Sequence, residues 1–182
     1  STDNKEVKFL DLLTNGLSEA KNPRIMLAYL VSLEARADLT LKGTFISLWA
    51  VQSGISLGLT PAESLAKAGF LFGFMLTIGI FTHFSWGFFF DRVNRVTATA
   101  VSMGLCASGY MSMYFVSSPL DYVNLPFFAL LSVGSATSIS VSIGLSGQEA
   151  TPENRGSIMG MIGLFGAFGI MLTQGIGGRV FD

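Results

Sequence analysis

Long apolar runs separated by short polar breaks dominate the pattern of this chain. Crossing the ~30 Å hydrocarbon core of a bilayer takes ~20 apolar helical residues. In lipid, every backbone amide and carbonyl must also find its partner within the spanning segment. The runs are therefore predicted to be membrane-spanning helices rather than strands. Five are predicted, over residues 24–51, 65–90, 96–117, 124–147 and 156–178.

Turn-forming residues mark the breaks between these runs. Breaks are predicted from Gly54 to Pro61, from Ser117 to Asp121 and from Glu149 to Arg155. Because the connections are short, sequential helices are expected to be antiparallel neighbours. The predicted fold class is an all-α integral membrane bundle of about five transmembrane helices.

Composition agrees with a lipid-facing surface. Half of the residues are hydrophobic and 13% are charged, and the mean hydropathy is +0.56. The net charge of −1 and the lack of a basic stripe exclude nucleic acid as an expected partner. One cysteine and one histidine do not make the usual Cys/His metal cluster. With no phosphate-binding loop or hydrolase motif, we expect neither a cofactor nor enzymatic activity.

Positive charges predict the orientation, because cytoplasmic loops retain Lys and Arg. With a cytoplasmic N-terminus, the inside segments hold seven of these charges and the outside segments two. The outside pair is Lys67 and Arg179. The inside set is Lys5, Lys8, Lys21, Arg24, Arg92, Arg95 and Arg155.

Residues 1–23 differ in character from the rest of the chain. Leucine and phenylalanine alternate there with charged residues, a pattern that suits an amphipathic helix on the cytoplasmic membrane surface. A plain tethering linker is the alternative. The segment lacks the apolar core of a signal peptide, and the chain starts at Ser1 rather than Met, as expected for a fragment or a processed chain.

The first predicted spanning helix contains charges where lipid would make them costly. Glu34, Asp38 and Lys42 are spaced four residues apart, so they form one stripe on one helix face. Each charge at bilayer depth costs ~2.5–3.5 kcal/mol on insertion scales, so each needs a partner or a wet cavity. Asp38 is expected to pair with Lys42, whereas Arg36 points elsewhere and needs a partner on another helix.

Two interpretations of these charges remain open. In the functional one, Glu34 or Asp38 exchanges a proton with a cavity while Lys42 or Arg36 tunes its affinity for protons. In the other, the charges form a static cluster that holds helices together. His83 is a candidate proton relay or a packing residue. Trp49 is an interfacial anchor or a surface on which a substrate stacks.

Small residues concentrate in the last two predicted helices. Gly134, Ser138 and Ser142 share one face, which favours close helix contact or a polar cavity wall. In the final helix, glycines predicted to serve helix packing and sliding recur every three residues. They are Gly160, Gly163, Gly166 and Gly169.

The stretch from Gly87 to Arg95 carries the most specific motif. Its pattern Gly87-x-x-x-Asp91-Arg92-x-x-Arg95 resembles the cytoplasmic signature loop of the major facilitator superfamily, with Asn94 where that family usually has glycine. The run from Gln148 into the glycine-rich last helix is similar to the region of the tenth and eleventh helices in bacterial members. The resemblance implies helices seven to eleven of the family's twelve.

By resemblance, Gly87, Asp91, Arg92 and Arg95 form a cytoplasmic gate. The implied function is part of a secondary active transporter that moves a small solute by alternating access, coupled to protons. Its expected partners are the solute, the bilayer and the missing transporter half or a homologous chain. Its expected location is the bacterial inner membrane. The alternative is a non-transporting assembly or regulatory module that retains the fold.

Overall fold

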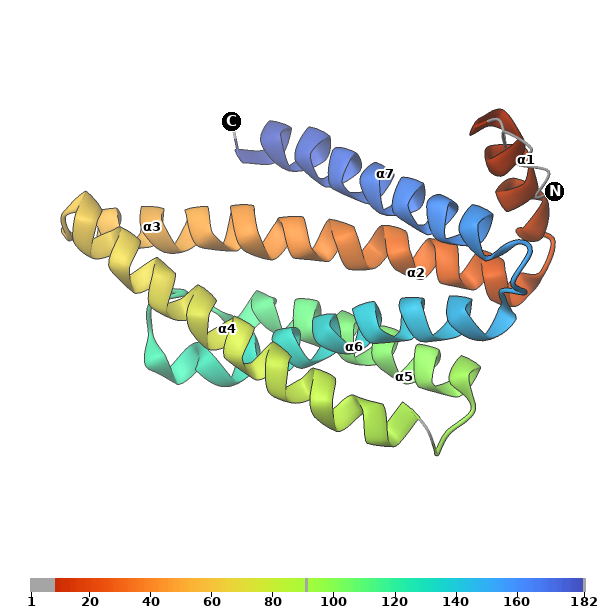
Figure 1. Cartoon of the computed structure of the whole chain (residues 1–182). Helices are drawn as coiled ribbons and strands as arrows, with labels where there is room; N and C mark the ends of the chain where they lie inside the picture. The colour runs from red at the N-terminus through yellow and green to blue at the C-terminus, as the bar shows by residue number, and fades with distance from the viewer. Residues whose placement is uncertain (1–8, 91, 182) are drawn as a thin grey trace, which may run out of the picture.

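The computed structural model describes residues 9–90 and 92–181, and every regular element within them is a helix (Figure 1). The predicted all-α fold is confirmed. Large apolar side chains lie on the outside of α4 (Pro61–Phe90), where Phe84 is 74% and Phe88 73% exposed. A surface of this kind suits lipid rather than water, so the chain is an integral membrane bundle.

The first predicted spanning segment corresponds to a continuous helical rod from Pro23 to Ser56. It joins α2 (Pro23–Thr40), the π-helix η1 (Leu41–Ile46) and α3 (Ser47–Ser56). Asn22 caps its start by accepting a hydrogen bond from the Arg24 amide. The rod is longer than predicted because Gly54, expected to break it, packs within it against Ser64 of α4. The chain turns instead at Gly58, whose φ of 84° only glycine adopts readily.

Side-chain caps also fix the starts of the next two helices. Thr60 and Glu63 bond reciprocally to each other's amides, at 2.9 and 3.3 Å, and begin α4. The Asn94 side chain accepts from the Val96 amide, so asparagine at this motif position begins a helix. The remaining elements are α5 (Arg95–Ser112), the 3₁₀ turns η2 (Met113–Phe115) and η3 (Tyr122–Asn124), α6 (Leu125–Glu149) and α7 (Arg155–Phe181).

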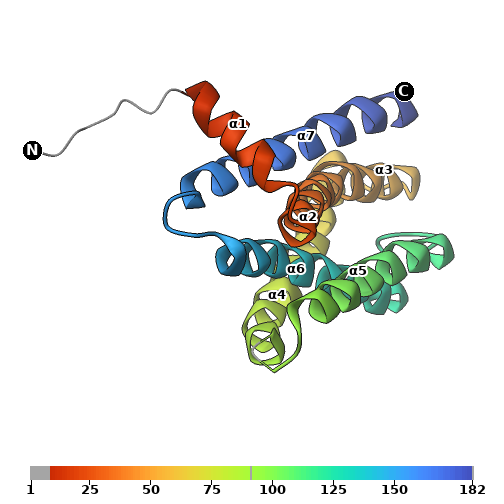
Figure 2. The same ribbon diagram turned by 90° about the vertical axis from the view of Figure 1, so that its right-hand side faces the viewer.

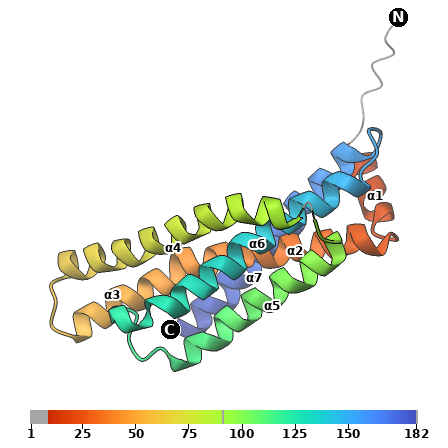
Figure 3. The same ribbon diagram turned by 90° about the horizontal axis from the view of Figure 1, so that it is seen from below.

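Helix packing does not follow chain order. α6 lies between α4 and α5 (Figure 3), and α2 lies between α6 and α7 (Figure 2). The expectation that sequential helices are neighbours is therefore wrong for α4 and α5 and for α6 and α7. Glycines select the closest pairs, since a side chain at Gly134 would meet the α5 backbone and one at Gly169 would meet the α2 backbone.

The amphipathic segment contains a helix, α1 (Phe9–Glu19), that packs against α7. Gly16 lies against Ser157 and Met161, and the buried Tyr29 hydroxyl donates to the Gly16 carbonyl at 2.8 Å. These contacts attach α1 to the end of the bundle. Residues 1–8 of the predicted linker lie outside the described residues, and a position on the membrane surface stays a prediction.

Three of the described helices are long and apolar enough to cross a membrane, whereas five spans were predicted. The three comprise α4, α6 with the preceding turn, and α7. The rod from Pro23 to Ser56 is long enough, at about 50 Å for a rise of ~1.5 Å per residue. The charges of α2 and the π-helical interruption of the rod keep α2 and α3 from meeting the criterion of length and apolar composition. The polar composition of α5 does the same for that helix.

Candidate functional site

A polar cluster lies where α2 and η1 meet α5 and α6, and Asp38 is at its centre. The Asp38 carboxylate is 3% exposed. Its Oδ1 accepts hydrogen bonds from the Tyr110 hydroxyl and from Ser135 Oγ, the latter at 2.9 Å. Its Oδ2 lies 3.0 Å from Lys42 Nζ. The predicted pairing of Asp38 with Lys42 is present, and two hydroxyl donors complete the surroundings of the carboxylate.

Glu34 belongs to the same cluster but has fewer partners. Its Oε1 accepts a hydrogen bond from the Cys106 thiol at 3.1 Å. Its Oε2 is buried and has no hydrogen-bond partner among the described residues. The Ser138 hydroxyl lies beside Glu34 but donates to the Gly134 carbonyl. Of the two carboxylates, Glu34 is therefore the one without an ion pair among the described residues.

The π-helix η1 begins next to Asp38 and contains Lys42. Its wider turn breaks the regular α-helical repeat where the ionic stripe passes from α2 to η1. No neighbouring atom lies within 4 Å of the Cβ position that a side chain at Gly43 would occupy. Short π-helical segments occur often at functional sites, which is consistent with a site here.

Arg36 lies on a different side of α2 from this cluster, as predicted. The Cβ position at Gly166 of α7 lies 2.7 Å from Arg36 Cγ, so the arginine stem passes over that glycine. Arg36 lines a small pocket between α2, α6 and α7. A partner on another helix was predicted, but neither ion pair within the described residues involves Arg36.

His83 lies on α4, outside the carboxylate cluster. Its Nδ1 is 2.8 Å from Ser140 Oγ of α6. Together with Lys42 it lines a pocket of about 160 Å³ between η1, α4 and α6. The structure thus brings His83 near Lys42 rather than near Glu34.

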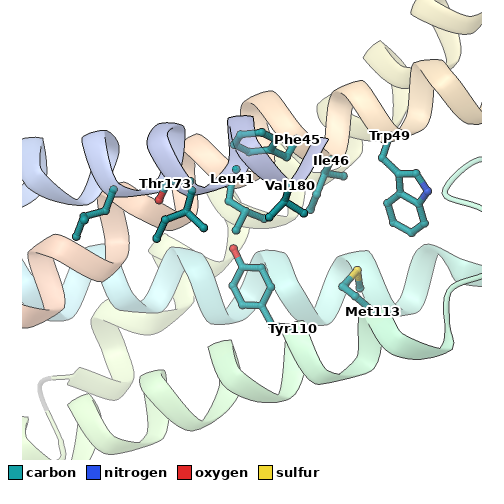
Figure 4. Close-up of a pocket in the computed structure, with 11 residues that line it drawn as sticks. Leu41, Phe45, Ile46, Trp49, Tyr110, Met113, Thr173 and Val180 are labelled. Atoms are coloured by element: carbon teal, nitrogen blue, oxygen red, sulfur yellow. The ribbon is translucent and has the colours of Figure 1, made fainter. Parts of the chain in front are cut away.

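Trp49 lines a cavity of about 500 Å³ between the rod, α5 and α7 (Figure 4). The walls are almost entirely apolar, with Phe45, Ile46 and Met113 among them. Tyr110 also lines this cavity and directs its hydroxyl toward the rod, where it bonds to Asp38. Trp49 is therefore part of an apolar wall, and Tyr110 connects this wall to the ionic cluster.

The motif from Gly87 to Arg95 runs from the end of α4 to the start of α5, and its two arginines differ in their surroundings. Arg95 donates to the Gly144 carbonyl at 2.6 Å and stacks over the Phe90 ring, which ties the start of α5 to α6. Arg92 is exposed, and no neighbouring atom lies within 4 Å of the Cβ position at Gly87. Asp91 lies outside the described residues.

The four glycines predicted for packing in α7 divide into two pairs. Gly166 and Gly169 lie against α2, where added Cβ atoms would come within 2.7 Å of Arg36 Cγ and 2.1 Å of the Leu33 carbonyl oxygen. Gly160 and Gly163 have open space around them. They pack against no other helix among the described residues, so their packing role stays a prediction.

Sequence reasoning missed several partners of the site. Tyr110, Cys106 and Ser135 come from α5 and α6, and only the tertiary fold brings them to α2. Glu149, expected to begin a turn, accepts hydrogen bonds from Asn22 and Arg24 and joins the start of α2 to the end of α6. The sequence did contain a signal for this contact. Asn22 and Arg24 stand at the start of one helix, and an acid, Glu149, ends another.

Glu34, Asp38 and Cys106 also form the one group of metal-ligating type found among the described residues. Their ligand atoms lie within 4.8 Å of one another. The ammonium group of Lys42, 3.0 Å from Asp38 Oδ2, would repel a cation from this position. The arrangement therefore favours an internal ion pair and an exchangeable proton over a metal ion.

Comparison with known proteins agrees with this architecture. "Magnetosome protein MamH" from Paramagnetospirillum magneticum is 30% identical over 161 residues, covering 88% of this chain and 37% of that protein. "Magnetosome protein MamZ" from the same organism is 27% identical over 163 residues, covering 88% and 25%. "Magnetosome protein MamZ" from Magnetospirillum gryphiswaldense is 26% identical over 163 residues, with the same coverage.

The chain therefore spans between a quarter and two fifths of the length of these relatives. No solved structure matches it. The family model described as Major Facilitator Superfamily matches residues 3–174, nearly the whole chain. This chain belongs to the major facilitator superfamily.

Proposed function

We propose that this chain forms the greater part of one half of a proton-coupled secondary transporter, with Glu34 as the proton carrier. Family membership supports a transporter-type function. The observation that carries the proton assignment is the contrast between the two buried carboxylates. Asp38 faces Lys42 and two hydroxyl donors, whereas one oxygen of Glu34 has no partner in the described chain.

This contrast gives the two acids different roles. A buried anion is tolerated when a cation and hydrogen-bond donors surround it, so Asp38 can stay charged. Glu34 has only a thiol donor on Oε1, and taking up a proton removes the cost of its buried charge. Glu34 then alternates between a neutral and a charged form as the site is exposed to either side. Asp38 and Lys42 remain a fixed pair that holds α2 against α5 and α6.

Alternating access requires one side of the bundle to close while the other opens. We assign closure on the cytoplasmic side to Asp91, Arg92 and Arg95. The Arg95 bond to the Gly144 carbonyl supports this assignment, because it fixes the loop after α4 to the inner part of α6. A small solute is the proposed cargo, and the face lined by α2, α4, α6 and α7 is its proposed path.

Infrared spectroscopy of the purified chain tests the proton carrier. The C=O stretch of a buried carboxylic acid, separate from the bands of the exposed acids, is expected to appear and disappear as pH is cycled. Glu34→Gln should remove this band, whereas the exposed Glu63→Gln variant should leave it unchanged. A band that survives in Glu34→Gln would exclude Glu34 as the carrier. Survival in Glu34→Gln of every titrating carboxylic-acid band of the native chain would favour the non-transporting membrane module.

Thiol labelling tests the proposed orientation in a bacterial inner membrane with a cytoplasmic N-terminus. In a Cys106→Ser background, which keeps a hydrogen-bond donor beside Glu34, single cysteines replace Glu153 or Leu57. Both positions are exposed at opposite ends of the bundle. A membrane-impermeant maleimide should label Leu57→Cys in intact spheroplasts, and Glu153→Cys only after the membrane is opened. The reverse pattern would invert the topology.

A further inference from the structure

Basic residues line one face of the bundle, and one of them, Arg36, has no acidic partner among the described residues. Two pockets lie along it, one between η1, α4 and α6 and one between α2, α6 and α7, and they share Ile139. The ionisable residues that line them are Arg36, Lys42 and His83, and neither lining includes an aspartate or a glutamate. Both carboxylates of α2 bond instead to side chains of α5 and α6.

Arg36 is the unsatisfied group on this face. Within the described residues the two ion pairs are Arg24 with Glu149 and Lys42 with Asp38, so Arg36 has no carboxylate partner. It lies 12 residues into α2 from Arg24, or about 18 Å along the helix at a rise of ~1.5 Å per residue. An arginine this deep faces a wet cavity or an anion rather than lipid.

The surroundings of Arg36 leave its guanidinium as the available donor. Gly166 provides the space through which the arginine stem passes. The hydroxyls of Ser32 and Ser142, in the same pocket, donate to the carbonyls of Ile162 and Ala28 at 2.9 and 3.2 Å. A planar guanidinium with free N–H groups matches the two oxygens of a carboxylate or a phosphate.

We propose that Arg36 binds the anionic group of the transported solute, a carboxylate or a phosphate, on the face lined by α2, α4, α6 and α7. Lys42, which is paired with Asp38, and His83 lie along the same face, so Arg36 is the cation there without an ion-pair partner among the described residues. This inference rests on the proposed transport function, since it names the chemical class of the solute. It does not depend on which acid carries the proton.

Equilibrium dialysis of the purified chain in an uncharged detergent tests the site, with radiolabelled inorganic phosphate and citrate as probes. Arg36→Gln should weaken binding of at least one probe by about tenfold or more, as expected for a lost charge-assisted hydrogen bond. The affinity of Arg36→Lys for the probe should lie between those of the native chain and Arg36→Gln, because lysine keeps the charge but not the forked geometry of the guanidinium. Lys67→Gln removes one positive charge from a different pocket and should bind like the native chain.

Several outcomes would overturn the proposal. They are no saturable binding of either probe, equal binding by the native chain and Arg36→Gln, or an equal loss in Lys67→Gln. Thermal unfolding checks the fold of Arg36→Gln separately. Because Arg36 is exposed, this variant should keep the native unfolding temperature. Loss of anion binding with an intact Glu34 infrared band would leave the proton assignment standing.

A second arm separates a free solute from a lipid headgroup of the same chemistry. The chain is placed in nanodiscs of phosphatidylcholine, with and without phosphatidylglycerol. A solute site should retain probe binding in both, with the same dependence on Arg36. Displacement of the probe by phosphatidylglycerol, together with Arg36-dependent retention of that lipid, would reassign the site to headgroups and overturn the solute proposal.

Discussion

Asp38→Asn is expected to destabilise the bundle by about 3–5 kcal/mol, the usual cost of removing one partner from a buried ion pair. The substitution leaves Lys42 facing a neutral amide in a position where its side chain is 12% exposed. It also places an amide group where Tyr110 and Ser135 now donate to a carboxylate oxygen. Thermal unfolding in detergent measures the effect, with a thiol-reactive fluorophore that labels the buried Cys106 as it becomes accessible.

A double variant separates the ion pair from general disruption of the site. Asp38→Asn combined with Lys42→Met removes both charges, so it should recover a large part of the stability lost in the single variant. Arg36→Gln serves as the matched change on the same helix, because Arg36 has no ion-pair partner among the described residues. Equal unfolding temperatures for Asp38→Asn and the native chain would mean that this pair does not hold the helices together.

Gly169→Val is expected to separate α7 from α2 and to cost about 1–3 kcal/mol or more, as for an overpacked core. An added Cβ would lie 2.1 Å from the Leu33 carbonyl oxygen and 3.2 Å from the Ala37 amide nitrogen. Both are backbone atoms of α2, so the clash cannot be relieved by a side-chain rotation. The same fluorophore assay measures the loss as a lower unfolding temperature.

Gly163→Val, six residues earlier in α7, provides the control. It makes the same change in composition and helix propensity, but the Cβ position there meets no neighbouring atom within 4 Å. Its unfolding temperature should stay close to the native value. If both valine variants lose stability equally, the effect comes from helix propensity and the close approach of α7 to α2 contributes little.

Much of the fold could be predicted from the sequence because lipid imposes simple rules on it. Apolar run length located the long helices, and the four-residue spacing of Asp38 and Lys42 placed their side chains together. Packing order could not be obtained in this way. It depends on where glycines let two backbones meet, and Gly169 brings α7 against α2, a helix far from it in the chain.

The site was predicted from one helix and completed by two others. A stripe of charges on α2 was readable from periodicity, but periodicity carries no information about which side chains face it. Cys106 and Tyr110 are separated from Glu34 and Asp38 by 72 residues each. The glycines of α7 also show that spacing does not determine contacts. Gly160 and Gly163 have the same spacing as Gly166 and Gly169 but different surroundings.

The π-helix in the middle of the rod changes the angular phase between its two ends. A wider turn holds about one residue more than an α-turn, so it rotates everything after Ile46 by roughly 100° relative to an uninterrupted α-helix. The charged stripe of α2 and the apolar wall that contains Trp49 can therefore lie on sides that a single α-helical wheel would not predict. Deleting one residue between Leu41 and Ile46 would bring the two ends back into one phase and move Trp49 away from its cavity.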